Sequence, residues 1–258
     1  MTDFEIYFPK INYRFPMVFV KGTGDTTYLF GDDLKLNIRI NDFFISKFLV
    51  TQQLWEYIMG SNPAAVKECN RPVETVSYNN ITSDGGFLEK LNEFHEINET
   101  IPGGLSFRLP TETEWEYAAR GGIHWKDGFH FSGSNDINTV GWYENNAGQI
   151  TDPIILHQLK NTQKGTETHE VGQKAPNQLG IFDMSGNVWE WCEDYYQSDA
   201  YKIPSDGTPC QVESQERVLR GGCHHNWAIH CTVYKRYQIT PGFADGCIGF
   251  RIAASGNQ

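Results

Sequence analysis

The chain has 258 residues, a net charge of −11 at neutral pH and 39% hydrophobic residues, which is enough to fill the core of one sizeable domain or two small ones. A surface that follows phosphates needs clustered cations, and no run of Lys or Arg occurs, so nucleic acid and anionic membranes are excluded as expected partners. The mean hydropathy of −0.48 and the absence of any stretch near the roughly 20 apolar residues of a spanning helix indicate a water-soluble chain.

Predicted strands come first along the chain. Residues 17–22 and 34–48 are predicted to be strands, and the second range shows the apolar–polar alternation of a half-buried sheet. A helix is predicted over 50–60, where Thr51 is a candidate N-cap and Gly60 a stop.

Two further helices follow. Residues 83–96 place their apolar side chains on one helical face. Residues 109–122 give the clearest helix, because Thr111 and Glu114 match a capping box and two glycines end the run.

The second half of the chain is richer in loops. From about residue 123 to 210, Gly, Asn and Asp are frequent, with no linker and no repeat period of 20–50 residues. We therefore expect one α+β domain over residues 1–258 with long loops. Its N- and C-terminal strands are expected to meet in a single antiparallel sheet that includes RVLRGG (217–222) and IGFRIA (248–253).

Targeting signals and cysteine spacing restrict the class of protein. The N-terminal MTDFEIYFPK lacks the basic region and apolar core of a secretory signal. Six cysteines are scattered without a Cys-x-x-Cys pair: Cys69, Cys192, Cys210, Cys223, Cys231 and Cys247. This pattern is too sparse for a disulfide scaffold and has the wrong spacing for structural zinc. It therefore does not indicate whether the protein works in a reducing or an oxidising compartment.

Four motifs in a fixed order resemble a known family. They are RLPTETEWEYAARGG (108–122), NQLGIFDMSGNVWEWCEDYY (177–196), RVLRGG (217–222) and GFRIA (249–253). This order resembles the formylglycine-generating, sulfatase-modifying-factor type of C-type lectin fold over residues 16–253. The resemblance implies an α+β fold with a mixed or antiparallel sheet, two or three helices and long loops.

The segment GNVWEW permits two interpretations. Gly186 allows a positive φ, and Trp189 and Trp191 point to one side of an extended segment, so the indoles are expected to wall the core. The resemblance implies instead a calcium site near Asn187 and Glu190, because calcium takes amide and carboxylate oxygens. No cofactor is required, and calcium is the candidate.

The family's enzymes oxidise a substrate cysteine with two thiols that hold copper, five residues apart after the RGG motif. Alignment on RGG places the second thiol on Cys231 and the first on Asn226. Two thiolates select Cu(I) and one holds it poorly, so we expect no enzyme activity. His224, His225 and His230 are nearby imidazoles, but no carboxylate stands beside them as an outer-shell partner.

The C-terminal part resembles more closely a second branch of the fold, the variable proteins of diversity-generating retroelements, in particular the treponemal type. The shared features are RVLRGG, the pattern A-x-x-C-T-V at 228–233, a proline at 241 and IGFR at 248–251. In that family, reverse transcription randomises adenines, mostly in AAC codons for Asn. The family's variable positions correspond to His224, His225, Asn226, Ile229, His230, Tyr234, Tyr237, Ile239, Gly242, Phe243, Asp245, Gly246 and Cys247.

The residue types at these positions fit such diversification. Changing the first two bases of AAC never yields Trp, Lys, Gln, Met or Glu, and Trp227, Lys235 and Gln238 all fall outside the set. Rigid aromatics mixed with adaptable polar residues are typical of an antibody paratope. We expect the thirteen positions to lie mostly exposed on one face. The scaffold between them is expected to include Arg220, a buried Trp227, Cys231, Pro241 and Arg251.

The resulting prediction is a non-enzymatic ligand-binding protein whose variable segment covers about 223–247. The expected partner is an unidentified macromolecule, above all a protein, bound by a monomer. The resemblance implies display at the cell surface or secretion; because the sequence has no signal peptide or lipobox, a cytoplasmic location stays open.

Two other functions also stay open. A divergent oxidase would be favoured by a second thiol beside Cys231, for which Cys223 and Cys247 are the local candidates. A lectin-like carbohydrate-binding module is the other alternative.

Overall fold

The computed structural model describes residues 1–32, 36–96, 101–148 and 166–256. The strands are β1 (Phe4–Phe8), β2 (Tyr13–Val20), β3 (Tyr28–Phe30), β4 (Leu36–Ile38), β5 (Phe43–Ser46), β6 (Leu105–Arg108), β7 (Trp189–Tyr195), β8 (Arg217–Arg220), β9 (Arg236–Ile239), β10 (Ile248–Gly249) and β11 (Ala253–Gly256). The helices are α1 (Gln52–Met59), α2 (Tyr78–Thr82), α3 (Phe87–Glu96), α4 (Glu112–Ala119) and α5 (Ile137–Val140). Short 3-10 helices cover Pro9–Ile11, Gly122–Asp127, Ala200–Lys202 and Ala228–His230.

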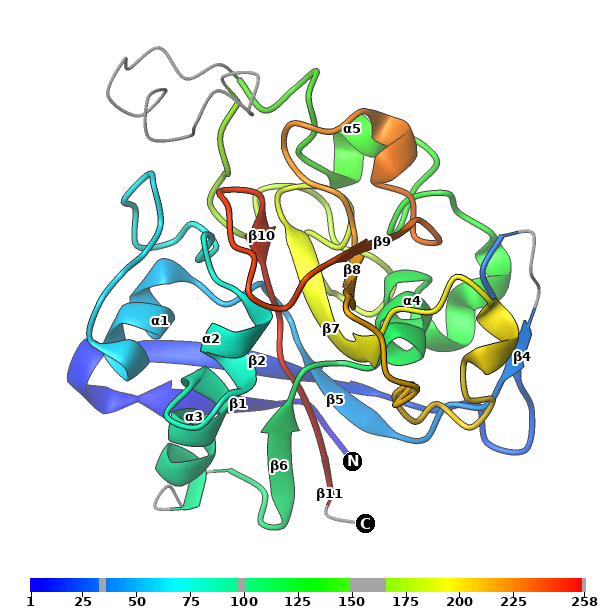
Figure 1. The fold of residues 1–258 in the computed structure, drawn as a ribbon, viewed down its shortest axis with the longest axis horizontal. Coiled ribbons are helices and arrows are strands. Elements are labelled where there is room, and N and C mark those ends of the chain that lie inside the picture. The colour runs from blue at the N-terminus through cyan, green and yellow to red at the C-terminus, as the bar shows by residue number, and fades with distance from the viewer. Residues whose placement is uncertain (33–35, 97–100, 149–165, 257–258) are drawn as a thin grey trace.

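The first and last strands of the chain meet in one antiparallel sheet of order β1-β2-β5-β11-β6. The first strand, β1, and the last strand, β11, lie in this one sheet with β2 and β5 between them (Figure 1). Alternate residues of β1 and β2, such as Ile6, Phe8, Phe15 and Met17, enter the same core cluster. The predicted meeting of N- and C-terminal strands is confirmed.

A second sheet, of order β10-β7-β8-β9, carries the C-terminal motifs. Its β10 runs parallel to β7, whereas β8 is antiparallel to both β7 and β9. We expected RVLRGG and IGFRIA to join the sheet of the terminal strands, and this was wrong for RVLRGG and for the start of IGFRIA. The chain changes sheets after Gly249: the carbonyls of Phe250 and Ile252 accept from the amides of Val50 and Ser46, which leads it into β11.

The predicted helix ends are confirmed at α1 and α4. The Thr51 hydroxyl accepts from the Leu54 amide, and α1 ends at Gly60 with φ of 77°. Thr111 and Glu114 form both hydrogen bonds of a capping box at the start of α4. Side-chain capping of free helix amides explains why these ends were visible in the sequence.

The long strand predicted over 34–48 is two strands in different sheets. β4 pairs with β3 in a separate two-stranded sheet, whereas β5 lies inside the five-stranded sheet. The chain between them is tied elsewhere: the Ile40 carbonyl accepts from the Thr23 amide at 2.9 Å, and the Asp42 carboxylate accepts from the Gly22 amide at 2.8 Å.

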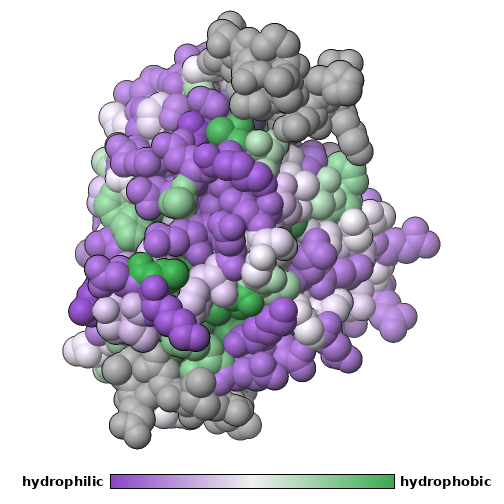
Figure 2. All heavy atoms as spheres, turned by 90° about the vertical axis from the view of Figure 1, so that its left-hand side faces the viewer, coloured by the Kyte–Doolittle hydropathy of each residue, from purple (hydrophilic) through white to green (hydrophobic). Residues whose placement is uncertain are grey.

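The core lies between and beside the two sheets, with Trp191 in one large cluster and Trp115 in another. Trp189 and Trp191 are both buried, as the residue-level interpretation of GNVWEW predicted. Figure 2 shows that the side of the molecule over α1 and α3 is mostly hydrophilic, with small separate apolar areas. Within the described residues, no helix has both the length and the apolar character needed to cross a membrane.

Candidate functional site

The C-terminal variable segment borders a cavity of about 600 Å³ that is lined in part by strands of the second sheet. Its lining comes from β7, β8, β9 and β10 and from the loops that precede β9 and β10. Eight of the thirteen predicted variable positions line it: His225, Asn226, His230, Tyr237, Ile239, Phe243, Asp245 and Cys247. The structure therefore brings together residues spread over more than twenty positions of sequence.

The floor of the cavity is built from the sheet itself. Leu219 of β8 and Ile248 of β10 contribute apolar surface. Trp189 of β7, 7% exposed, stacks on the Tyr237 ring with centroids 5.3 Å apart. Tyr237 and Phe243 are 46% and 41% exposed, so two large aromatics stand at the opening. Exposed aromatic groupings of this kind mark interaction sites.

The other five variable positions lie outside the cavity lining. Ile229 is 66% exposed, Gly242 is exposed, and the Tyr234 hydroxyl lies 3.4 Å from the His130 ring. His224 and Gly246 are buried. Of the thirteen positions, four are exposed, six are half-buried and three are buried, the third being Cys247 at the cavity wall. Fewer than half of them are therefore as exposed as expected.

His224 is a correction with a clear cause. Its ring nitrogens lie 2.9 Å from the Thr166 hydroxyl and 3.2 Å from the Gly246 carbonyl, so both are used inside the protein. Burial, and then the charge of the neighbouring His225, lower the pKa of His224 to about 3. The His224 ring is neutral and structural at neutral pH.

Arg220 fixes the chain that leads into β9. Its guanidinium is fully buried, pairs with Glu112 at 3.2 Å and Glu116 at 2.5 Å, and donates to the Val233 and Tyr234 carbonyls. Arg220 thereby attaches this part of the variable segment to α4. A buried charge is tolerable only when it is paired and hydrogen-bonded in this way.

Arg251 connects the two sheets through a buried ion pair and hydrogen bonds. It pairs with Glu190 at 2.6 and 3.0 Å and donates to the Ser46 and Phe182 carbonyls. The Trp115 indole also donates to Glu190 at 2.8 Å.

These contacts bear on the calcium candidates. Both oxygens of Glu190 accept from Arg251, and the amide oxygen of Asn187 accepts from the His169 backbone at 3.0 Å. A calcium ion at Glu190 would have to displace the buried Arg251 guanidinium.

Trp227 is a second correction. We expected a buried scaffold tryptophan, but Trp227 is 63% exposed. It precedes the 3-10 helix Ala228–His230, and this helix turns Cys231 inward while it leaves Trp227 at the surface. Cys231 is fully buried, as expected of a scaffold residue.

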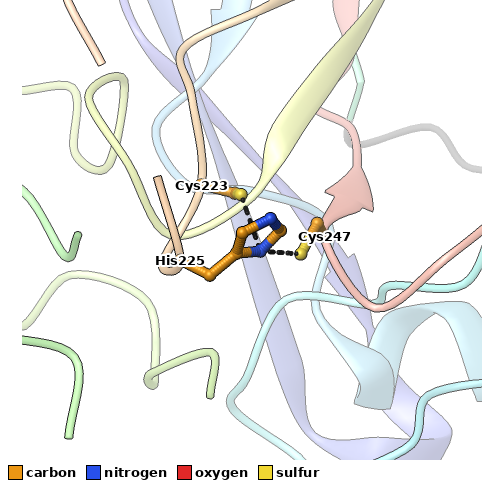
Figure 3. A group of neighbouring side chains, drawn as sticks. All are labelled: Cys223, His225 and Cys247. Atoms are coloured by element: carbon orange, nitrogen blue, oxygen red, sulfur yellow. Dashed lines mark hydrogen bonds between the residues drawn. The ribbon is translucent and has the colours of Figure 1, made fainter. Parts of the chain in front are cut away.

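Cys231 lies close to Cys223, one of the two local candidates for a second thiol. The Cys231 sulfur contacts the carbonyls of Cys223 and Trp227 at 4.0 and 3.9 Å, and burial raises its pKa well above the ordinary value. Cys223 and Cys247 instead face the same His225 Nδ1, at 3.4 and 2.6 Å (Figure 3). The two local candidates for a second thiol lie beside one another and beside His225, a grouping that the sequence did not indicate.

Cys223 is the more acidic of these thiols. Burial alone would raise its pKa, but hydrogen bonds with Cys247 and His225 and the charge of His225 lower it to about 6. The pKa of Cys247 is raised well above the ordinary value by burial and by the Cys223 thiol. The first proton therefore leaves from Cys223.

With this geometry described, comparison with known proteins gives the family. The family described as "Sulfatase-modifying factor enzyme 1-like domain" matches residues 16–255. The chain belongs to this family, and its mixed helices and curled sheets are those of the C-type lectin-like fold.

Named relatives within the family differ in function. The chain is 37% identical over 210 residues to "Chaperone protein LppX" of Paenibacillus barcinonensis, covering 72% of this chain and 70% of that protein. It is 31% identical over 207 residues to the formylglycine-generating enzyme of Thermomonospora curvata, covering 78% of this chain. The chain spans 61% of the length of that enzyme.

Solved structures add a variable protein. Treponema denticola variable protein 1 superposes with a TM-score of 0.75 and 26% identity, covering 98% of this chain and 99% of that one. PvdO from Pseudomonas aeruginosa superposes with a TM-score of 0.70 and 20% identity over 93% of this chain and 94% of that one, which shows the shared fold. The chain is thus similar over its whole length to a protein described as variable.

Proposed function

We propose that this protein is a non-enzymatic ligand-binding protein whose segment 223–247 is a binding face diversified by a retroelement. The observation that carries the proposal is the convergence of eight predicted variable positions on one cavity of about 600 Å³. The full-length similarity to Treponema denticola variable protein 1 supports the same conclusion.

The residues around the cavity suit a face that changes its side chains. Arg220 and Arg251 hold the surrounding backbone through buried ion pairs, and neither belongs to the variable set. Tyr237 and Phe243 provide rigid contact area, while His230 and Asp245 provide polar contacts. Antibody paratopes likewise combine rigid aromatic residues with adaptable polar residues.

The thiol arrangement supports a non-enzymatic role. Position 226 carries Asn, and the Cys231 side chain is fully buried. We therefore place the protein's function in binding. The partner we propose is a protein at the cell surface, bound by one copy of this chain.

The test is amplicon sequencing of this gene and its flanks from a growing population of the source organism. We expect amino-acid differences concentrated at the thirteen variable positions, with Arg220, Cys231 and Arg251 unchanged. We also expect a nearby adenine-rich copy of the last 40 or so codons beside a reverse-transcriptase gene. Differences spread evenly along the gene, or no such copy, would contradict the proposal.

A further inference from the structure

A cluster of metal-ligating side chains lies in the wall of the cavity. One ligand atom from each of Cys223, His225 and Cys247 lies within 4.8 Å of the other two. Cys223 directly follows the turn after β8, and Cys247 directly precedes β10, so the two strands on either side of β7 set their positions. The His225 ring lies between the two sulfurs.

We propose that Cys223, His225 and Cys247 bind one zinc ion whose fourth coordination position faces the cavity. Two thiolates and one imidazole form a known zinc ligand set, and a site with three protein ligands keeps one position open. His225 and Cys247 belong to the proposed variable set, so the site is a property of this sequence of the segment and is not expected in its diversified variants. Metal binding itself requires no protein ligand.

The distances are close to those of a tetrahedral site. Zinc–sulfur bonds of about 2.3 Å and zinc–nitrogen bonds of about 2.0–2.1 Å place sulfur and nitrogen roughly 3.6 Å apart. The Cys223 sulfur already lies 3.4 Å from His225 Nδ1. The Cys247 sulfur, at 2.6 Å, must move away by roughly 1 Å, which a small side-chain rotation provides.

The surroundings supply an outer shell and an entry path. The Gly246 carbonyl, 3.2 Å from His224 Nε2, requires the tautomer whose proton sits on Nε2, and the Cys247 sulfur lies 3.5 Å from the same nitrogen and can share that proton. That proton can stabilise a thiolate at Cys247, as outer-shell partners do in metal sites. His225 and Cys247 line the cavity, so an ion and a fourth ligand reach the site through it.

Zinc titration of the reduced full chain against a chromophoric chelator tests the proposal. We expect one zinc per chain and affinity at least about 100-fold weaker in His225→Ala, since loss of an outer-shell partner alone costs 10–100-fold. His230→Ala, an imidazole lining the same cavity, and Cys69→Ala, an exposed thiol, are the matched controls and should bind like the parent. Zinc should also raise the melting temperature of the parent and leave that of His225→Ala unchanged.

Cobalt substitution checks the ligands and the open position. We expect a thiolate-to-cobalt charge-transfer band in the parent that is lost in Cys247→Ala, and a change in the cobalt spectrum when free imidazole is added. The His225 side chain is half-exposed, and His225→Ala keeps both thiols. The metal-free form of this variant should therefore melt at the same temperature as the metal-free parent.

Three results would overturn the proposal: zinc binding unchanged in His225→Ala, equal loss of binding in the two controls, or a stable Cys223–Cys247 disulfide in the isolated protein. None of these depends on finding a protein ligand, so failure of the metal site is distinguishable from failure of the binding face.

Discussion

At the scale of single residues, the aromatics at the cavity opening should matter little for folding. Tyr237 and Phe243 are more than two-fifths exposed, and exposed substitutions usually change stability by about 0.5 kcal/mol or less. We expect each alanine variant, and Trp227→Ala as well, to lose less than about 1 kcal/mol in urea denaturation. Trp191→Ala, the buried control, should lose at least about 3 kcal/mol. Similar losses at Trp191 and Tyr237 would mean that the variable segment is core.

Replacing a buried arginine, in contrast, should lower the free energy of unfolding strongly. Arg251→Met leaves Glu190 charged inside the protein without its ion-pair partner, although the Trp115 indole still donates to it, and breaking a buried pair costs about 3–5 kcal/mol. The control Arg14→Met removes an exposed pair with Glu5 at 3.3 Å and should cost less than about 1 kcal/mol. Unfolding curves of both variants measure the difference, and a loss at Arg251 no larger than at Arg14 would refute the scaffold role.

The sequence predicted which positions contribute to the cavity, but it did not predict which of the nearby side chains are buried and which are exposed. Motif order and codon logic placed Tyr237, Phe243 and Asp245 in the variable set, and all three line the cavity. The same reasoning could not show that His224 is buried or that Trp227 is exposed. Those outcomes depend on the 3-10 turn at Ala228–His230 and on contacts with Thr166, which is distant in sequence.

At the scale of elements, the turn after β8 should accept only glycine at position 222. Its φ is +75°, and an added Cβ would lie 2.6 Å from the Cys231 sulfur and 2.7 Å from the His230 carbonyl oxygen. We expect Gly222→Ala to lose more than about 2 kcal/mol, because strained backbone costs 1–3 kcal/mol before any clash. Gly242→Ala, where the nearest atom is 3.9 Å away, is the control and should be close to neutral. Thermal melting of both variants measures the difference. Equal losses in Gly222→Ala and Gly242→Ala would contradict the requirement for glycine at position 222.

The contact between β7 and the start of α4 should make stability depend on pH. The Asp194 carboxylate accepts from the backbone amides of Glu112 and Cys210, and burial, with the Glu112 charge, raises its pKa to about 8. Between the ordinary value of about 3.9 and 8, the folded state holds a proton that the unfolded state has lost. Stability from this group therefore falls as pH rises through that window.

Urea denaturation at pH 5 and pH 7.5 measures this dependence. Asp194→Asn should show a smaller loss of unfolding free energy between the two pH values than the parent. The exposed carboxylate of Asp206 has a lowered pKa, so Asp206→Asn should match the parent over this range. An unchanged pH dependence in Asp194→Asn would contradict the account.

Helix ends were predicted correctly where they depend on hydrogen bonds between residues close in sequence. Strand bounds were predicted wrongly where they depend on which distant strands pair. The caps of α1 and α4 are side-chain hydrogen bonds within four residues, so their ends were predictable. The alternation over 34–48 continues through the break between β4 and β5, and only the contacts with Thr23 and Gly22 reveal that break.

At the scale of the whole molecule, we propose that the described parts of residues 1–256 form one domain. The last strand, β11, pairs with β5 on one side and β6 on the other, so the C-terminus completes a sheet that the N-terminus begins. Arg251 ties this sheet to β7 of the second sheet through Glu190. The binding face therefore rests on a framework closed by both ends of the chain.

The central claim is that this framework folds whatever side chains the binding face carries. A displayed library randomised at the seven cavity positions that are not buried tests it, with protease resistance reporting the folded fraction. Those positions are His225, Asn226, His230, Tyr237, Ile239, Phe243 and Asp245. A matched library is randomised at seven buried positions, Phe107, Trp189, Trp191, Val218, Leu219, Ile248 and Phe250.

Close-packed interiors respond to the change of a single methylene, whereas exposed positions tolerate most side chains. We predict that most members of the cavity library resist protease like the parent, while most members of the buried library do not. Equal loss of folded members in the two libraries would contradict the claim that segment 223–247 is a tolerant binding face.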